Sequence, residues 1–405
     1  MARRPLFKDR ICAVIAAPTA ALAQRQIEIV REVASTLELR LDWLRNADEI
    51  DEMMHWATAA KPLPCLIATC RRKESGGQFP GRIGDEAFWL TLAGNLGFPW
   101  RDMPLESAEH FGRDLRAWLM RGKIILSYHD FKATPRNLAR IRRRLLTFRP
   151  DAVKVATQCN SYADSLRVLA LCNGRRPPRR VIAVPMGEIG LPARVLALKH
   201  GSALAYAAVG QKTAPGQLTL EEMKYLYRAD KLDPRSRVYG VIGNPVSHSL
   251  SPLLHNTGFI ARGMNDVYLP FLVPDLRDFL RAVEPLGLAG FSVTLPHKQA
   301  ILRHLDDCDP LAAAIGAVNT VVVRGTGKLY GYNTDYVGVL RALQKRVALR
   351  GSRVLLYGAG GAARAISFAL AQEGAIVNIC ARRPAEARKL ARAAGGQAIE
   401  RRHLR

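Results

Sequence analysis

A regular alternation of short apolar runs with amphipathic stretches extends through the first 231 residues and constrains the fold more than any other feature. Eight β–α repeats over about 220 residues are typical of a (β/α)8 barrel, in which functional groups lie at the carboxyl ends of the strands. The expected strands are residues 11–17, 36–42, 65–69, 124–129, 152–156, 181–185 and 203–209, with a weaker one at 103–105. The clearest expected helices are 21–34, 85–96, 135–148 and 162–172.

A polar segment at 228–237 separates this repeat from a second α/β region, which opens with an expected strand at 238–243. Further on, a strand at 353–357 turns through glycines into a helix at 362–373 and a strand at 376–380. That order is the opening of a doubly wound, Rossmann-type fold. We therefore predict a barrel at 1–231, an α/β domain at 237–340 and part of a nucleotide-binding domain at 341–405.

The net charge of +25 favours a nucleic acid or an anionic membrane surface as a possible class of partner. The basic residues are spread along the chain, however, without interleaved aromatics or the spacing of a zinc finger or helix-turn-helix. A solvated basic surface is the better interpretation, and a nucleic-acid-binding protein remains only a distant alternative.

Seven scattered cysteines with no C-x-x-C pair and no histidine at metal spacing indicate reduced thiols in a cytoplasm and no metal site. Arg3 and Arg4 precede an apolar run at 11–17, which resembles a signal peptide, but the run is short and stops at Pro18. We interpret it as the first barrel strand. No apolar run approaches the ~20 residues that a membrane span requires.

Lys154 lies between two valines in Asp-Ala-Val-Lys-Val-Ala, so strand alternation directs it into the barrel when the valines face the helices. Loss of solvation favours the neutral amine, which can attack a ketone and form a Schiff base. His129, in Ser-Tyr-His-Asp-Phe at the end of an adjacent strand, can move a proton in either direction. The alternative, an interior lysine paired with a carboxylate and a hydrogen-bonded histidine, is equally compatible with these two residues alone.

Glu38, Arg40 and Asp42 alternate on one face of one expected strand, and three charges facing a barrel interior need polar partners or a polar ligand. With them, the chain resembles type I 3-dehydroquinate dehydratase over nearly all of residues 8–231. The residues that carry the resemblance are Glu38-x-Arg40-x-Asp42, Arg71 with Gly76-Gly77, Ser127-x-His129-Asp130-Phe131, Lys154, the run from Met186 to Arg194, and Ala214-Pro-Gly-Gln217.

The resemblance implies that Lys154 forms the Schiff base and that His129 is the general acid and base. It also implies a bidentate grip of Arg194 on the substrate carboxylate. The other implied substrate contacts are Glu38, Arg40, Arg71, Gln217 and Thr213, which stands where a serine is common. The family commonly has an acidic residue four places after the arginine, where this chain has Ser75, and we expect the neighbouring Glu74 to approach His129 in its place.

A second group of polar residues follows the linker. Ser249 and Ser251 precede Pro252, a pattern typical of a helix N-terminus, and hydroxyls at a helix start can also bind a carboxylate. Lys298 and Asp335 suit proton transfer to a hydroxyl during hydride transfer. With Thr294 and Asn319, these motifs resemble the substrate-binding half of shikimate dehydrogenase over residues 237–340, which implies that Lys298 and Asp335 are the catalytic pair and that Ser249, Ser251, Thr294 and Asn319 surround the substrate.

Glycines at the turn near residue 358 follow an expected strand and open a helix, which favours a dinucleotide site over an ordinary tight turn. The implied cofactor contacts are Gly358, Gly360, Gly361 and Ala362, with Arg382 and Arg383 after the next strand. Arginines at that position suit a 2′-phosphate, so NADP is predicted. The triplet Asn-Arg-Thr of the family is Ala-Arg-Arg here.

Together, the resemblances imply a cytoplasmic enzyme of the shikimate pathway with two activities, and homodimers are an open alternative to monomers. It would dehydrate 3-dehydroquinate to 3-dehydroshikimate and reduce that product to shikimate with NADPH. A complete dinucleotide-binding domain has about six strands, and this chain supplies two or three before Arg405. We therefore expect dehydratase activity with little or no dehydrogenase activity, and a dehydratase with a non-catalytic dehydrogenase remnant is the alternative.

Overall fold

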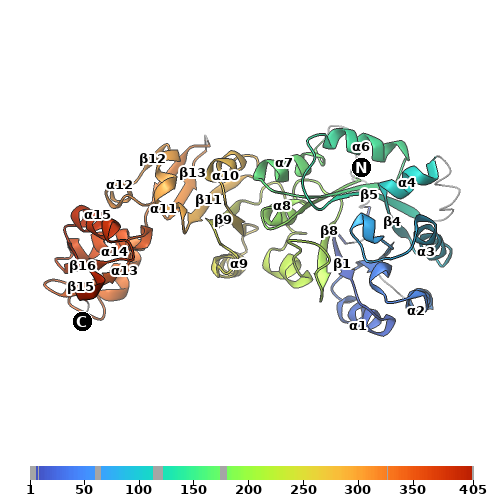
Figure 1. The fold of residues 1–405 in the computed structure, drawn as a ribbon, viewed down its shortest axis with the longest axis horizontal. Coiled ribbons are helices and arrows are strands. Elements are labelled where there is room, and N and C mark those ends of the chain that lie inside the picture. The colour runs from blue at the N-terminus through green and yellow to red at the C-terminus, as the bar shows by residue number, and fades with distance from the viewer. Residues whose placement is uncertain are drawn as a thin grey trace. The chain divides into compact units, whose positions relative to one another are not determined.

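The computed structural model describes residues 6–7, 9–59, 65–112, 122–173, 180–325 and 327–403 (Figure 1). The chain divides into two compact units, each described here by itself. The first comprises Met1–Ser236, Leu253–Val267 and Asp278–Leu286, and the second comprises Arg237–Pro252, Tyr268–Arg277 and Gly287–Arg405. The predicted division into three domains stays a prediction.

Eight parallel strands form the core of the first unit, in the order β7-β6-β5-β4-β3-β2-β1-β8. They are β1 (Ile11–Ile15), β2 (Thr36–Arg40), β3 (Cys65–Thr69), β4 (Trp100–Pro104), β5 (Lys123–Asp130), β6 (Ala152–Gln158), β7 (Val181–Met186) and β8 (Ala205–Val209). The sheet is nearly closed. Between β7 and the residues just before β8, the Ala203 amide donates to the Val181 carbonyl at 2.8 Å and the Ala183 amide donates to Ser202 Oγ at 3.1 Å. The prediction of a (β/α)8 barrel is confirmed.

Helices follow most of these strands. They are α1 (Ala20–Val30), α2 (Ala47–Ala59), α3 (Ile83–Asn95), α4 (Leu105–Phe111), α6 (Leu138–Thr147), α7 (Tyr162–Ala170) and α8 (Leu191–Leu196), with 3-10 turns at Leu41–Trp43 and Lys73–Ser75 and a short π-helix at Glu222–Leu226. Local sequence explains α1: Thr19 Oγ1 accepts the Leu22 amide at 3.3 Å, and a stripe from Ala20 to Val30 is buried.

The weak strand predicted at 103–105 is wrong in its bounds. β4 begins at Trp100 and ends at Pro104, and Leu105 is the first residue of α4. The error has a physical cause, because Arg101 and Asp102 are fully buried charges inside β4, where an apolar run would be expected.

The segment predicted to be a linker is held on the barrel. It contains no helix or strand from 228 to 237, but the Lys199 ammonium donates to the carbonyls of Asp233, Pro234 and Ser236 at 3.1, 3.3 and 2.8 Å. Three charge-assisted bonds fix this backbone to the end of the first unit.

The second unit contains a six-stranded sheet in the order β10-β9-β11-β13-β14-β12 and a three-stranded parallel sheet in the order β15-β16-β17. The strands are β9 (Val238–Gly243), β10 (Val267–Leu272), β11 (Leu288–Val293), β12 (Asp307–Cys308), β13 (Thr320–Val323), β14 (Leu329–Tyr332), β15 (Arg353–Tyr357), β16 (Ile376–Cys380) and β17 (Gln397–Ala398). The remaining helices of the chain are α9 (Ser251–Ala261), α10 (Leu276–Ala282), α11 (His297–Ala300), α12 (Pro310–Ile315), α13 (Asp335–Leu343), α14 (Gly361–Gln372) and α15 (Pro384–Ala394), with 3-10 turns at Ile301–His304 and Arg401–His403.

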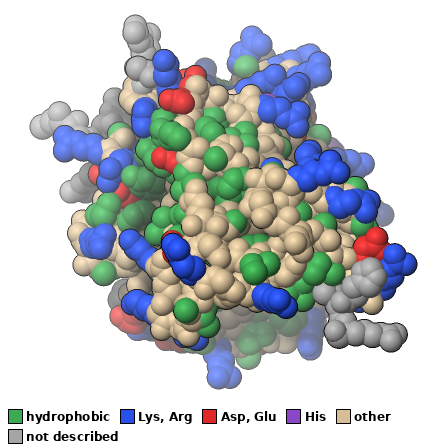
Figure 2. Space-filling model, turned by 90° about the vertical axis from the view of Figure 1, so that its left-hand side faces the viewer, with side chains coloured by type: hydrophobic (Ala, Val, Ile, Leu, Met, Phe, Trp, Pro, Cys, Tyr) green, Lys and Arg blue, Asp and Glu red, His purple; other side chains and the backbone are tan. Residues whose placement is uncertain are grey.

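Three predicted strands of this region, β9, β15 and β16, have the expected bounds. The surface view in Figure 2 shows lysines and arginines scattered over one face rather than gathered in a single block. In the described part of the chain, no helix is long and apolar enough to cross a membrane.

Candidate active sites

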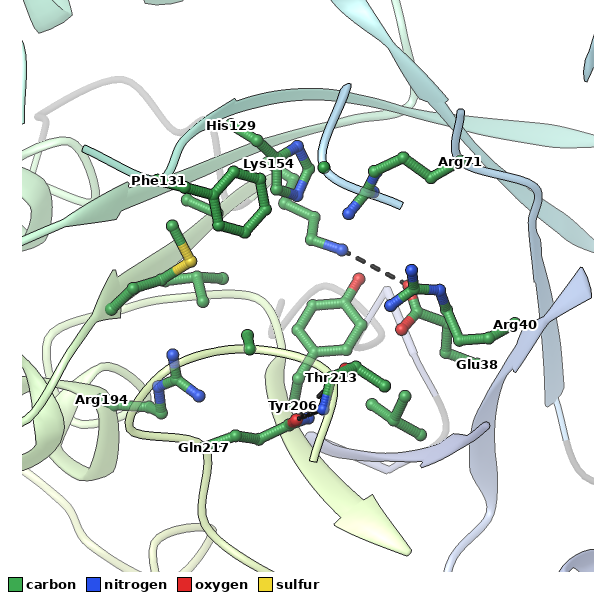
Figure 3. Close-up of a pocket in the computed structure, with 16 residues that line it drawn as sticks. Glu38, Arg40, Arg71, His129, Phe131, Lys154, Arg194, Tyr206, Thr213 and Gln217 are labelled. Carbon is green, nitrogen blue, oxygen red and sulfur yellow. Dashed lines mark hydrogen bonds and ion pairs between the residues drawn. The ribbon is translucent and has the colours of Figure 1, made fainter. Parts of the chain in front are cut away.

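One end of the barrel forms a pocket that brings together the eight side chains predicted to act on or bind the substrate there (Figure 3). Its polar lining comes from β2, β5, β6, α8 and the loops after β3 and β8. These side chains are Glu38, Arg40, Arg71, His129, Lys154, Arg194, Thr213 and Gln217.

Lys154 is the centre of the charged network in this pocket. Its Nζ donates to Asp102 Oδ2 at 2.8 Å and to Glu38 Oε1 at 3.4 Å, and only 6% of its side chain is exposed. The lysine therefore does face inward from β6, as its flanking valines predict. It is also paired with carboxylates, so the structure is compatible with both alternatives that the sequence left open: a buried amine close to His129 and an interior cation with carboxylate partners.

Asp102 is the site residue that the sequence reasoning missed. Besides Lys154, it accepts hydrogen bonds from Ser127 Oγ at 2.6 Å and from Arg71 at 3.2 Å. Burial alone would raise the pKa of Asp102, but Lys154 and Arg71 hold it below its usual range. A buried carboxylate thus orients both cations. The predicted strand begins at Met103, one residue after Asp102, and so leaves it out.

His129 lies at the carboxyl end of β5, and its ring stacks on Phe131 with centroids 6.0 Å apart. Burial, followed by the positive charges of Arg71 and Lys154, lowers the pKa of His129 well below its usual value, and Asp102 opposes this shift. The imidazole is therefore neutral near pH 7 and can accept a proton.

Arg40 and Asp42 form a buried bidentate pair with distances of 2.8 and 2.7 Å. The expectation that Asp42 continues the inward face of β2 is wrong, because the strand ends at Arg40 and Asp42 lies in the following 3-10 turn. There it also accepts the Gln78 amide at 3.1 Å. Asp42 fixes Arg40 and the loop over the pocket instead of lining the pocket itself.

Arg194 is a buried cation whose described hydrogen bonds reach only backbone carbonyls. Its Nε donates to Pro185 O and its Nη2 to Pro215 O, both at 3.2 Å, and within the described ranges no carboxylate forms an ion pair with it. Burial lowers the pKa of Arg194 to about 10, which leaves it charged at neutral pH. An anion entering the pocket would supply the missing partner.

A second pocket lies in the second unit and contains all six side chains predicted for it: Ser249, Ser251, Thr294, Lys298, Asn319 and Asp335. Lys298 Nζ donates to Asp335 Oδ2 at 2.6 Å, and Asn319 Nδ2 donates to Asp335 Oδ1 at 2.8 Å. The aspartate is thus held on both oxygens, with its ammonium partner beside it.

The glycine turn after β15 is open and leads directly into α14. Gly358 has a φ of +131°, and Gly360 is the N-cap of α14, which begins at Gly361 and continues with Ala362. The Gly358 amide donates to Cys380 O at 2.8 Å, so the turn lies beside the end of β16, where exposed Arg382 and Arg383 follow. Open space above Gly358 and Gly360 and exposed arginines fit a pyrophosphate and a 2′-phosphate.

Residues 11–234 match the family model described as type I 3-dehydroquinase, which covers more than half of the chain. The chain belongs to the type I 3-dehydroquinase family. Residues 241–321 match a second model, the shikimate dehydrogenase substrate binding domain.

Curated relatives combine or separate these two parts. The chain is 36% identical over 386 residues to the bifunctional 3-dehydroquinate dehydratase/shikimate dehydrogenase of Arabidopsis thaliana, covering 90% of this chain and 63% of that protein. It is 31% identical over 396 residues to the shikimate biosynthesis protein AroDE of Chlamydia pneumoniae, covering 96% and 79%. Over 142 residues it is 54% identical to a shikimate dehydrogenase (NADP(+)) of Bacillus cereus, covering 34% and 51%. The chain thus spans less than two thirds of the first relative and about half of the third.

The position where type I 3-dehydroquinases commonly carry an acid is Ser75 here, and the expectation that Glu74 replaces that acid is wrong. The side chain of Glu74 is 82% exposed and pairs with Arg72, which also binds buried Glu86 at 2.9 Å. The negative charge of Asp102, by contrast, favours the protonated form of His129 and raises its pKa against the effect of burial.

The adjacent glycines have a packing role. A Cβ on Gly76 would lie 2.0 Å from the Phe131 ring, and one on Gly77 would lie 2.0 Å from the Arg71 carbonyl. The double glycine therefore lets this loop close against Phe131, which stacks on His129.

Proposed function

We propose that the barrel dehydrates 3-dehydroquinate to 3-dehydroshikimate through a Schiff base on Lys154. The observation that carries this proposal is one pocket that holds a buried amine, an imidazole of lowered pKa and an arginine without a carboxylate partner in the described chain. An α-hydroxy carboxylate with a ketone would use all three groups. Membership of the type I 3-dehydroquinase family supports the same substrate.

In the proposed reaction the neutral amine of Lys154 attacks the ketone carbon, and the ketone oxygen leaves as water. The protonated imine draws electrons from the neighbouring carbon, from which His129 removes a proton. The resulting enamine expels the hydroxyl one carbon further on, and His129 returns its proton to that hydroxyl. Water then releases the product from Lys154.

Binding roles follow from position. Arg194 holds the substrate carboxylate, assisted by Gln217, whose Oε1 already accepts from the Thr213 amide at 2.7 Å and hydroxyl at 3.1 Å. Glu38, Arg40 and Arg71 lie across the pocket and hold the hydroxyls (Figure 3).

A dehydration assay on Lys154→Ala tests this function. We expect a loss of at least about a thousandfold in kcat, because no other group supplies the nucleophile. Lys132→Ala, which removes an exposed lysine near the end of β5, is the matched control and should keep full activity. Turnover by Lys154→Ala within tenfold of the wild type would refute the proposal.

We further propose that the second unit carries the site at which 3-dehydroshikimate is reduced to shikimate, with Lys298 and Asp335 placed to supply the proton to the carbonyl oxygen. That this chain itself has little or no dehydrogenase activity stays a prediction. Ser249, Ser251, Thr294 and Asn319 surround the substrate in this proposal. Bound NADPH would supply the hydride, with its pyrophosphate at Gly358, Gly360, Gly361 and Ala362 and its 2′-phosphate on Arg382 and Arg383. The 54% identity to a shikimate dehydrogenase (NADP(+)) supports the substrate and the cofactor.

Equilibrium binding tests this second function independently of turnover. Arg382→Ala should weaken NADP binding about tenfold and leave NAD binding unchanged, since only NADP carries the 2′-phosphate. Equal weakening for both nucleotides would remove the phosphate contact. We also propose a cytoplasmic location, which the seven free cysteines support, and a homodimer as the alternative to a monomer.

A further inference from the structure

One polar group in the barrel pocket has no role in the proposed reaction. Tyr206, on β8, is 5% exposed and lines the pocket with Lys154. Its hydroxyl oxygen is buried and has no hydrogen-bond partner among the described residues. Buried polar groups are nearly always paired, so an unpaired one inside a substrate pocket indicates a partner that the substrate brings.

The ring of Tyr206 has a separate role that does not need the hydroxyl. Lys154 Nζ lies over this ring, 4.0 Å from its centroid, which places the cation on the negative face of an aromatic group. Phenylalanine would supply the same face and fill the same space. The hydroxyl is therefore an addition that packing and the lysine do not explain.

Figure 3 shows where this hydroxyl points: toward the space between the Lys154 amine and Glu38. A ketone carbon attacked by Lys154 would bring its oxygen into that region. Burial, with the negative charges of Glu38 and Asp102, raises the pKa of Tyr206 well above its usual value. The hydroxyl thus keeps its proton at any working pH and can act as a donor.

We propose that Tyr206 is a catalytic residue for imine formation, donating a hydrogen bond to the ketone oxygen while Lys154 attacks. This inference rests on the proposed Schiff-base function of Lys154. The nitrogen–carbon bond forms, and the π electrons of the carbonyl move to the oxygen that Tyr206 holds. That oxygen takes one proton from the attacking nitrogen and one from solvent and leaves as water, while Tyr206 keeps its own proton.

Tyr206→Phe tests the proposal because it removes the hydroxyl and keeps the ring. In single turnovers quenched with borohydride, we expect the adduct on Lys154 to form about a hundredfold more slowly than in the wild type. The deuterium isotope effect for substrate labelled at the carbon next to the ketone should fall toward 1, because imine formation then limits the rate. The melting temperature should not fall, since no protein hydrogen bond is lost.

Tyr227→Phe is the matched control, because it removes the hydroxyl of another buried tyrosine in the same unit outside the pocket. It should trap the adduct at the wild-type rate. The proposal is overturned if Tyr206→Phe also traps at that rate, or if only KM rises while the isotope effect is unchanged. Absence of a Lys154 adduct in the wild type would instead refute the Schiff-base function itself.

Discussion

The two sites use the same pair of groups, a lysine against an aspartate, in different surroundings. In the barrel, the side chain of Lys154 is 6% exposed and that of Asp102 is fully buried, whereas those of Lys298 and Asp335 are 15% and 29% exposed. The lysine–aspartate distances are nearly equal, at 2.8 and 2.6 Å. The two sites therefore differ in solvent access. The buried Lys154–Asp102 pair suits an amine that must attack carbon, and the more exposed Lys298–Asp335 pair suits proton delivery.

Burial has a consequence for stability. When one partner of a buried ion pair is removed, the other charge stays buried and uncompensated. When one partner of a partly exposed pair is removed, water can solvate the charge that remains. The barrel site therefore depends on all its charges at once, while the second site tolerates loss of one.

The largest stability effect is expected for removal of the buried aspartate, and it tests this difference between the sites directly. Asp102→Asn should lower the free energy of unfolding by about 3 kcal/mol, since it leaves Lys154 and Arg71 buried with one carboxylate fewer. Asp335→Asn should cost less than about 1 kcal/mol. Denaturant unfolding of both variants measures the difference, and equal losses would show that burial does not distinguish the sites.

Replacing His129 by glutamine should lower kcat for dehydration about a hundredfold while still permitting imine formation. The wild-type pH profile sharpens the assignment. The pKa of His129 is lowered in the folded state, so the acid limb of kcat/KM should lie below pH 6.5.

The lowered pKa of His129 also makes the folding stability depend on pH. As pH falls from 6.5 toward the folded-state pKa, the unfolded chain binds a proton that folded His129 does not, so stability decreases over that window. His129→Gln should remove that part of the decrease. An acid limb above pH 6.5 would contradict a neutral imidazole.

Arg194→Lys should raise KM about tenfold with a smaller effect on kcat, because a point charge replaces the fork that grips a carboxylate. Steady-state kinetics of dehydration by the wild type and by Arg194→Lys measures both constants. An unchanged KM would show that the carboxylate binds elsewhere in the pocket.

The smallest effect is expected at Glu74. Its carboxylate is exposed and paired with Arg72, so Glu74→Gln should leave both kcat and the pH profile of dehydration within twofold of the wild type. A shifted profile would mean that Glu74 approaches His129 during turnover.

Sequence reasoning recovered what depends on local pattern. The alternation around Lys154 predicts its inward direction, and the serines before Pro252 predict the start of α9. Asp102 could not be found in that way, because its role depends on partners far away in the sequence: Lys154 on β6 is 52 positions away, and Arg71 in the loop after β3 is 31. The predictions for Asp42 and Glu74 failed for local reasons. The strand ends at Arg40, two residues earlier than predicted, and Arg72, two residues before Glu74, binds its carboxylate.

We propose that the buried amine of Lys154 is the nucleophile of the barrel. Borohydride reduction in the presence of 3-dehydroquinate, followed by peptide mapping with mass spectrometry, tests it most directly. We expect one covalent adduct, on Lys154, with irreversible loss of dehydration. An adduct on another lysine, or continued turnover with no adduct, would contradict the account.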